Sequence, residues 1–430
     1  MVIDSLIDAL RSRCEEFFDR RSGSNLSYSM ADIGMAAFSV FFMQSPSFLS
    51  YQRSLEQRRQ RSNCQTLFTM EKIPTDNHIR TMLDPVAPDA VFPLFGQALG
   101  VLEERGGLTN FRRLDGRVLI AVDGTEYFTS QKLHCPKCSH RKRNNGATEY
   151  HHSMLSAALV APGHARVMPL EPEFITPQDG HDKQDCENVA MKRWLSKFGP
   201  RYAPLKPVYL GDDLYSRQPI CEAVQRVGGN FIFTAKPSSH ACLYEWLQGV
   251  EVPALEKKVK KGRTFVTHRY RWMEDVPIRD GKGARHVNWF MIEIINKAGK
   301  VTYTNSFVTD LPVNEQTVCD LAACGRARWK IENENFNTLK TKGYHLEHNF
   351  GHGQDHLASL LVTMNLLSFA FHTVCDLVAR QWRKARDVIA TRRRFFEELR
   401  TITRYLVFAD WGALIRTMIT GEPPPQPGTR

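Results

Sequence analysis

The sequence has little that would direct the chain into or across a membrane. Residues Met1 to Arg20 carry charges throughout, so they lack the apolar segment of a secretory signal. The longest apolar run, Met35 to Met43, is too short to cross a bilayer and is better interpreted as part of a buried helix. We therefore expect a soluble, intracellular protein with no membrane partner.

Paired cysteines are scarce as well. Ten cysteines are scattered over 430 residues, and Cys135-Pro136-Lys137-Cys138 is the one Cys-x-x-Cys pair. In an intracellular chain such cysteines are free thiols rather than a disulfide framework. There is also no internal repeat and no low-complexity tract, and the length is sufficient for two or three ordinary domains.

Acidic residues are in the minority, with 46 Asp and Glu against 57 Lys and Arg and a net charge of +11. The cations are clustered, which favours a polyanionic partner such as nucleic acid over a merely basic enzyme. The clusters lie at Arg53 to Arg61, Lys257 to Lys261, Arg380 to Arg386 and Arg392 to Arg394.

Residues 1–112 read mostly as helix, and the middle of the chain alternates between strands and helices. The order of three strands, helix, strand, helix and strand predicts an α/β core with a mixed sheet. The expected strands are Arg117 to Val122, His152 to Ala161, Ala165 to Ile175, Pro207 to Leu210 and Asn230 to Ala235, and the expected helices are Asp185 to Phe198 and Arg217 to Val227.

Residues 237–324 have the alternation of a β-rich block, with a hairpin turn expected at Asn296 to Lys300. Leu357 to Ala379 is a strongly apolar helix that we expect to lie in the core, and a basic helical tail follows it to about Thr420. The Pro-rich end, Gly421 to Arg430, is expected to be disordered.

Three acidic residues stand out against this background. Asp123 and Asp212 each follow a buried strand, where ligands bind in α/β sheets, and Glu332 lies on a helix without Gly or Pro, Arg328 to Lys340. Arg328 and Glu332 are four residues apart and share a face of that helix. Three carboxylates would suit Mg²⁺ or Mn²⁺ rather than Zn²⁺.

Each acid also has a purely structural interpretation. Asp123 could cap a turn to Gly124, and Asp212 or Asp213 could cap the next helix, with Asp213 the better candidate for that role. Glu334 competes with Glu332 as the third acid, but it is displaced by about 200° around a regular helix. We favour Glu332 because it keeps the Arg-x3-Glu spacing.

Together these residues resemble the DDE transposases of bacterial insertion sequences, in the group with a Y-x2-R-x3-E-x6-K signature. The resemblance covers roughly residues 115 to 370 and rests on Val-Asp123-Gly-Thr, Leu-Gly-Asp212-Asp-Leu-Tyr and Arg328-Trp-Lys-Ile-Glu332-Asn-Glu. Two positions depart from the signature: Gly325 stands where tyrosine is expected, and the lysine falls one place late, at Lys340.

The resemblance implies a ribonuclease-H-like catalytic core in which Asp123, Asp212 and Glu332 bind two divalent metal ions. It implies that Arg328 and Lys340 contact DNA phosphates and that the β-rich insertion presents an aromatic residue, here Trp272, to a flipped base; a half-buried strand tryptophan is the alternative. The division is then a helical DNA-binding region at 1–112, a core at 113–236 and 325–385, an insertion at 237–324 and a basic tail at 386–430.

The function expected from this resemblance is DNA transposition. The protein would bind the terminal inverted repeats of an insertion sequence, cleave phosphodiesters and join the 3′-hydroxyl ends to target DNA, as a homodimer in the bacterial cytoplasm at the nucleoid. The alternatives are a metal-dependent DNA endonuclease without strand transfer and a catalytically inactive DNA-binding derivative.

Cys135 and Cys138 form half of a structural zinc site. The sequence does not identify the other two zinc ligands. The alternative to a zinc site is a loop that contains two free thiols. Arg141, Lys142 and Arg143 suit phosphate contacts with or without zinc. For a histidine series at 348, 352 and 356, a loop with polar contacts is favoured over zinc binding. The residues available to complete a zinc site with Cys135 and Cys138 are His134, His140, His151, His152, His181 and Cys186.

Overall fold

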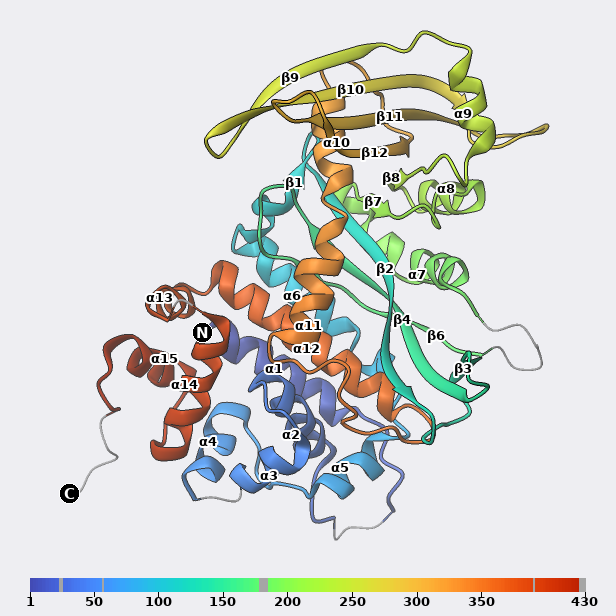
Figure 1. Ribbon diagram of the computed structural model, residues 1–430. Coiled ribbons are helices and arrows are strands. Elements are labelled where there is room, and N and C mark those ends of the chain that lie inside the picture. Colours follow the sequence, from blue (N-terminus) through green and yellow to red (C-terminus); the bar gives the residue numbers. More distant parts are fainter. Residues whose placement is uncertain (23–25, 56–57, 178–184, 390, 425–430) are drawn as a thin grey trace.

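The computed structural model describes residues 1–22, 26–55, 58–177, 185–389 and 391–424. A long sheet runs through the molecule, with helices against both faces of its central part, and the strands β9 to β12 continue the same sheet at one end (Figure 1). The side chains of the predicted Arg53 to Arg61 cluster lie largely outside the described residues. The same is true of His181 and of the end of the Pro-rich tail beyond residue 424.

The centre of the sheet has the order β5/β6–β4–β2–β7–β8. The strand β4 pairs antiparallel with β2 on one side and with β5 and β6 on the other, whereas β7 and β8 run parallel to β2. This order and these directions are those of a ribonuclease-H-like fold, so the predicted fold class is confirmed. The strands are β2 (Arg117–Ser130), β4 (Thr148–Val160), β5 (Met168–Pro169), β6 (Glu173–Ile175), β7 (Val208–Gly211) and β8 (Asn230–Thr234).

Both faces of this core are covered, which explains why β2 and β7 are continuous apolar runs. On β8, Ile232 faces the helix α10, while Phe233 faces Tyr215 on the other side. The helices on the Phe233 side are α7 (Glu187–Tyr202) and α8 (Gln218–Arg226); those on the opposite side are α10 (Val318–Arg326), a π-helical turn η4 (Ile331–Phe336) and α11 (Asn337–Thr341).

The β-rich insertion continues the core sheet. Its last strand pairs antiparallel with β8, with Val308 opposite Phe233. The predicted hairpin turn is present, since the Asn296 N–H donates to the Lys300 carbonyl over 2.9 Å. The sequence did not predict the lysine-rich strand β9, which forms the edge of the sheet. Its charged side chains oppose pairing with a further strand. The elements are α9 (Ala241–Gln248), β9 (Ala254–Lys261), β10 (Thr264–Pro277), β11 (His286–Ile295) and β12 (Val301–Thr309).

The remaining helices form one layer in which the N-terminal region packs against the C-terminal tail (Figure 1). Trp411 contacts Phe42 and Phe68, and its Nε1–H donates to the Leu67 carbonyl over 2.7 Å. The helices are α1 (Val2–Glu15), α2 (Met30–Phe42), α3 (Phe48–Leu55), α4 (Arg58–Phe68), α5 (Asp76–Leu83), η1 (Pro88–Val91), α6 (Pro93–Glu104), η2 (Gly107–Phe111), α12 (Leu357–Val378), α13 (Arg380–Val388), α14 (Arg392–Tyr405) and α15 (Trp411–Thr420), with the short strands β1 (Arg112–Arg113) and β3 (Ser139–Lys142) elsewhere.

By length and composition, α12 is apolar enough to cross a membrane, but 89% of its most apolar window is buried inside the molecule. It contacts α2, α6 and α13, as the core helix of this layer. The sequence expectation of a buried core helix at this place is therefore confirmed.

Candidate active site

Asp123, on β2, and Asp212, the residue directly after β7, occupy equivalent positions along two neighbouring parallel segments. The last registered pair of β2 and β7 is Ala121 with Leu210, and each aspartate comes two residues later. Parallel strands lie about 4.8 Å apart and alternate side chains share a face, so both carboxylates leave the sheet at the same edge and on the same side.

One detail of the sequence interpretation is wrong. The strand β2 does not end at Asp123 but runs to Ser130, because its antiparallel pairing with β4 continues after the parallel pairing with β7 has stopped. The edge that exposes Asp123 is therefore produced by the early end of β7 at Gly211.

The guanidinium of Arg328 brings the third acid to this edge. Its Nη1 lies 2.8 Å from Glu332 Oε1 and 3.6 Å from Asp123 Oδ2. Glu332, not Glu334, is therefore the acid on the Asp123 side of the helix. Glu334 lies elsewhere, beside Lys330 and in a basic pocket described below.

Glu332 lies in a π-helical turn, whereas a regular helix was expected from Arg328 to Lys340. Asparagines account for this difference, because their side chains compete for hydrogen bonds within a helix. The Asn333 amide donates to the Trp329 carbonyl over 3.1 Å, and the Asn335 amide reaches Ser156 on β4 over 3.2 Å. Such turns often occur at functional sites.

A fourth carboxylate, Glu187 at the start of α7, approaches Asp123 from the other side. It accepts a hydrogen bond from the Tyr215 hydroxyl over 2.9 Å and lies against the backbone of Gly124. A Cβ on Gly124 would lie 2.3 Å from the Glu187 carboxylate, so only glycine permits this approach. Sequence reasoning missed Glu187; its position in the first turn of an expected helix was the available signal.

The gathering of acids perturbs their protonation. Burial and the negative charges of Glu187, Asp212 and Glu332 raise the pKa of Asp123 to about 7, against the opposing effect of Arg328. Burial and the charge of Asp212 likewise raise the pKa of Glu187. Uncompensated carboxylate charge of this kind fits a hard divalent cation with oxygen ligands.

The turn to Gly124 considered for Asp123 is present, but neither Asp212 nor Asp213 caps the next helix, α8, whose N-cap residue Arg217 has no side-chain capping hydrogen bond. Asp123 accepts from the Gly124 N–H over 3.0 Å, and Asp212 accepts from the Leu214 N–H over 2.8 Å. Asp213 accepts from the Lys236 N–H over 2.6 Å and from the Ser239 hydroxyl, which is a structural role. The other carboxylate oxygen of Asp123, Oδ2, takes no part in its turn and lies 3.6 Å from Arg328 Nη1.

The two departures from the transposase signature have local explanations. A Cβ on Gly325 would lie 2.9 Å from the Phe307 ring, because α10 packs directly on β8 and β12, so a tyrosine does not fit there. The Lys340 ammonium pairs with Glu347 at 2.8 Å instead of approaching the carboxylates.

The structure does not leave all of the predicted DNA-contacting residues available. Arg141 pairs with Glu149 at 2.8 Å and with Glu126, and Arg143 also pairs with Glu149. Lys142 is exposed on β3. Trp272 is half-buried and packs against the core, as its alternative interpretation has it.

The candidate zinc ligands Cys135 and Cys138 lie together with two histidines. Of the partners considered from the sequence, His152 joins them, whereas His134 stacks on Tyr150. The fourth member is His352. The loop expected around it is present, and it brings His352 beside the two cysteines and His152.

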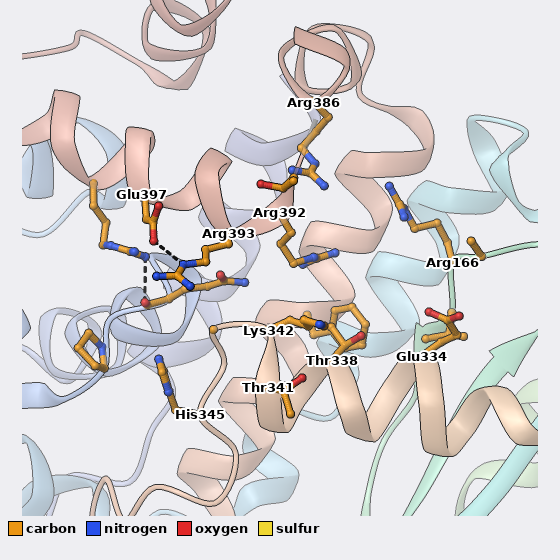
Figure 2. Close-up of a pocket in the computed structure, with 18 residues that line it drawn as sticks. Arg166, Glu334, Thr338, Thr341, Lys342, His345, Arg386, Arg392, Arg393 and Glu397 are labelled. Carbon is orange, nitrogen blue, oxygen red and sulfur yellow. Dashed lines mark hydrogen bonds and ion pairs between the residues drawn. The ribbon is translucent and has the colours of Figure 1, made fainter. Parts of the chain in front are cut away.

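A basic pocket lies behind the helix that carries Glu332. It has a volume of about 780 Å³, and Figure 2 shows Glu334, Thr338 and Lys342 on one wall opposite a group of arginines. Three of these arginines surround the buried carboxylate of Asp376, which leaves a surplus of positive charge. They are Arg166, Arg386 and Arg392, at 3.0, 3.6 and 3.4 Å.

No family model matches this chain, and no curated protein matches it. A solved structure described as a piggyBac transposase synaptic complex with hairpin DNA aligns with a TM-score of 0.43 and 11% sequence identity. The alignment covers 100% of this chain and 86% of that chain. At this level of similarity, inference about function has to come from the residues of this chain.

Proposed function

We propose that this protein is a DDE-type transposase of an insertion sequence. The observation that supports it is the convergence of Asp123, Asp212 and Glu332, from three separated segments, at one edge of a ribonuclease-H-like sheet. Its substrate would be double-stranded DNA, at the terminal inverted repeats of the element and at a target site.

In this proposal Asp123, Asp212 and Glu332 hold two Mg²⁺ or Mn²⁺ ions. Bound ions of this kind activate a water or a 3′-hydroxyl and stabilise the leaving oxygen in phosphodiester chemistry. Arg328 orients two of the carboxylates through its contacts with Asp123 and Glu332. Glu187, held by the Tyr215 hydroxyl, fixes the β2 backbone at Gly124 beside Asp123.

The DNA backbone would follow the cationic surfaces of the molecule. The pocket beside Glu334 offers Lys342, Arg392 and Arg393 within reach of the back of the Glu332 helix (Figure 2). On the insertion, Phe265 is 59% exposed and lies with Lys258 and Arg263 in a second hollow, which suits stacking on a base better than the half-buried Trp272 does. Two element ends need two active sites, so we propose a homodimer on DNA, working at the bacterial nucleoid.

The test uses labelled element ends, a plasmid target and Mg²⁺. Cleaved ends joined to the plasmid are the expected products, and Asp123→Asn should remove both steps while DNA binding persists. Ends that are cut but never joined would favour the endonuclease alternative. Binding without cutting by the wild-type chain would favour the inactive derivative.

A further inference from the structure

Four potential metal ligands from three segments meet in one place, although His352 lies 214 residues from Cys138 along the chain. Cys135 and Cys138 lie between β2 and β3, His152 lies on β4, and His352 lies in the loop between α11 and α12. Their two sulfurs and two ring nitrogens all lie within 4.8 Å of one another. Cys138 and His152 are buried.

The distances match a tetrahedron around one ion. At tetrahedral angles, with Zn–S of about 2.3 Å and Zn–N of about 2.0 Å, two sulfurs lie about 3.8 Å apart and a sulfur and a nitrogen about 3.5 Å apart. The Cys135 and Cys138 sulfurs are 3.9 Å apart, and His152 Nε2 is 3.5 Å from each of them. His352 Nε2 is 3.6 Å from the Cys138 sulfur, so a small movement of its ring completes the tetrahedron.

We propose that Cys135, Cys138, His152 and His352 form a structural Cys₂His₂ zinc site. Two thiolates with two imidazoles in tetrahedral arrangement are the donor set of structural zinc, and four protein ligands leave no open position for catalysis. This site is separate from the carboxylate cluster, and its proposal does not depend on the function proposed above.

The surrounding structure holds the ligands in position. The Cys138 N–H donates to the Cys135 carbonyl over 3.1 Å, and the Cys135 N–H points to the Cys138 sulfur over 3.4 Å, which closes the turn between them. The His152 ring stacks on Tyr127, and the His352 ring lies 4.3 Å from the Phe128 ring, centroid to centroid. Packing of this kind restricts the orientation of both imidazoles.

The ion would join two parts of the active-site scaffold. The cysteines lie in the connection that follows β2, the strand that carries Asp123, and His352 lies in the loop that follows the helix carrying Glu332. That loop is already held to α5, because the Asp84 carboxylate accepts from the N–H groups of Gln354, Asp355 and Leu357. Zinc would thus fix the position of the Glu332 helix relative to β2 through a second attachment.

The first measurement is the metal content of the full-length protein purified from zinc-supplemented medium. We expect one zinc ion per chain, and a tetrahedral Co²⁺ spectrum with thiolate charge-transfer bands after exchange. Removal of zinc with a chelator should lower the melting temperature, and stoichiometric zinc should restore it, since a ligand bound to the folded state stabilises that state. Substoichiometric zinc together with an unchanged melting temperature would overturn the proposal.

The second measurement compares His352→Ala with His356→Ala. His356 lies in the same loop and contacts Lys137 at 3.0 Å, but it is not one of the four ligands. Competition with a chelator should show that His352→Ala loses more zinc affinity than the roughly 10- to 100-fold that loss of an outer-shell partner costs. His356→Ala and the exposed Cys186→Ser should keep wild-type affinity. Equal affinities for the two histidine variants would exclude His352 as a ligand.

Discussion

Asp123, on β2, and Asp212, directly after the end of β7, each lie two residues beyond Ala121 and Leu210, the last registered pair of these parallel strands. The register of the parallel pairing therefore sets their positions along the strands. Because side chains of a strand alternate between the two faces, the two carboxylates also lie on the same face of the sheet. The third acid reaches them by a different route, through the Arg328 guanidinium that contacts both Asp123 and Glu332.

The two acids of the π-helical turn form a matched pair for mutagenesis. Glu332→Gln should reduce DNA cleavage about 100-fold or more, because it removes a carboxylate from the cluster. Glu334→Gln should retain cleavage within about threefold, because Glu334 lies in the basic pocket. Single-turnover cleavage of labelled element ends measures both, and the reverse order would contradict the assignment of the third acid.

Asp123→Asn should stabilise the metal-free protein at high pH. The folded chain keeps a proton on Asp123 up to a pKa of about 7, whereas the ordinary value is 3.8. The folded state therefore binds more protons between these values, and its stability falls as pH rises from about 4 to 7. Urea unfolding in EDTA should show the variant more stable by about 2 kcal/mol at pH 8, with little difference at pH 4. Equal stability at pH 8 would show that the carboxylate is not perturbed.

Binding of Mn²⁺ should weaken as the pH falls below about 7, by up to about tenfold per pH unit, because the proton on Asp123 competes with the metal. Glu187→Gln removes a negative charge that raises the pKa of Asp123, so the midpoint of this dependence should move to lower pH. Calorimetric titration at several pH values measures the shift. Glu256→Gln serves as the control and should leave the midpoint unchanged, since Glu256 pairs with Arg269 in the β-rich insertion.

Lys342→Ala and Arg393→Ala should weaken DNA binding by about threefold to tenfold each and lower the slope of log K against log salt by roughly one. Both side chains line the basic pocket. Arg393 pairs with Glu397 at 2.8 Å, but its side chain is 88% exposed, and such a surface pair is weak enough to be exchanged for a phosphate. Arg226→Ala, on the exposed side of α8, is the charge-matched control and should bind like the wild type. A fluorescence titration at several salt concentrations decides; equal losses in all three variants would mean that only net charge matters.

Gly325→Ala should destabilise the protein by about 1–3 kcal/mol, because its Cβ would lie 2.9 Å from the Phe307 ring and the core would have to shift. Gly100→Ala in α6 is the control, since no atom lies within 4 Å of its Cβ position and alanine favours helix by about 1 kcal/mol. Thermal unfolding measures both. A stable Gly325→Ala protein would show that α10 can move away from the sheet.

Local pattern was sufficient for much of the fold. The aliphatic runs of β2 and β7, the turn at Asn296 and the apolar helix α12 were predictable, because strand and helix periodicity and turn chemistry are local properties. The extension of β2 beyond Asp123 was not, because it depends on which partner strand continues and which one stops.

The candidate site divides in the same way. Spacing along the chain gave reason to select Glu332 over Glu334, and the contact with Arg328 lies on that side. Glu187 approaches Asp123 only because Gly124 leaves room for it, and His352 reaches Cys138 only because two distant loops meet. Neither approach has a signature in the spacing of residues.

By itself, the sequence determined the mixed α/β core, the position of Asp123 and Asp212 after its aliphatic runs, and the two cysteine ligands of the proposed zinc site. These features depend on neighbours along the chain. The tertiary structure alone decided the fourth carboxylate, the π-helical turn under Glu332, the surplus of arginines around Asp376 and the two histidines beside the cysteines. These features are contacts between segments far apart in the sequence, and packing of the whole chain is what brings such segments together.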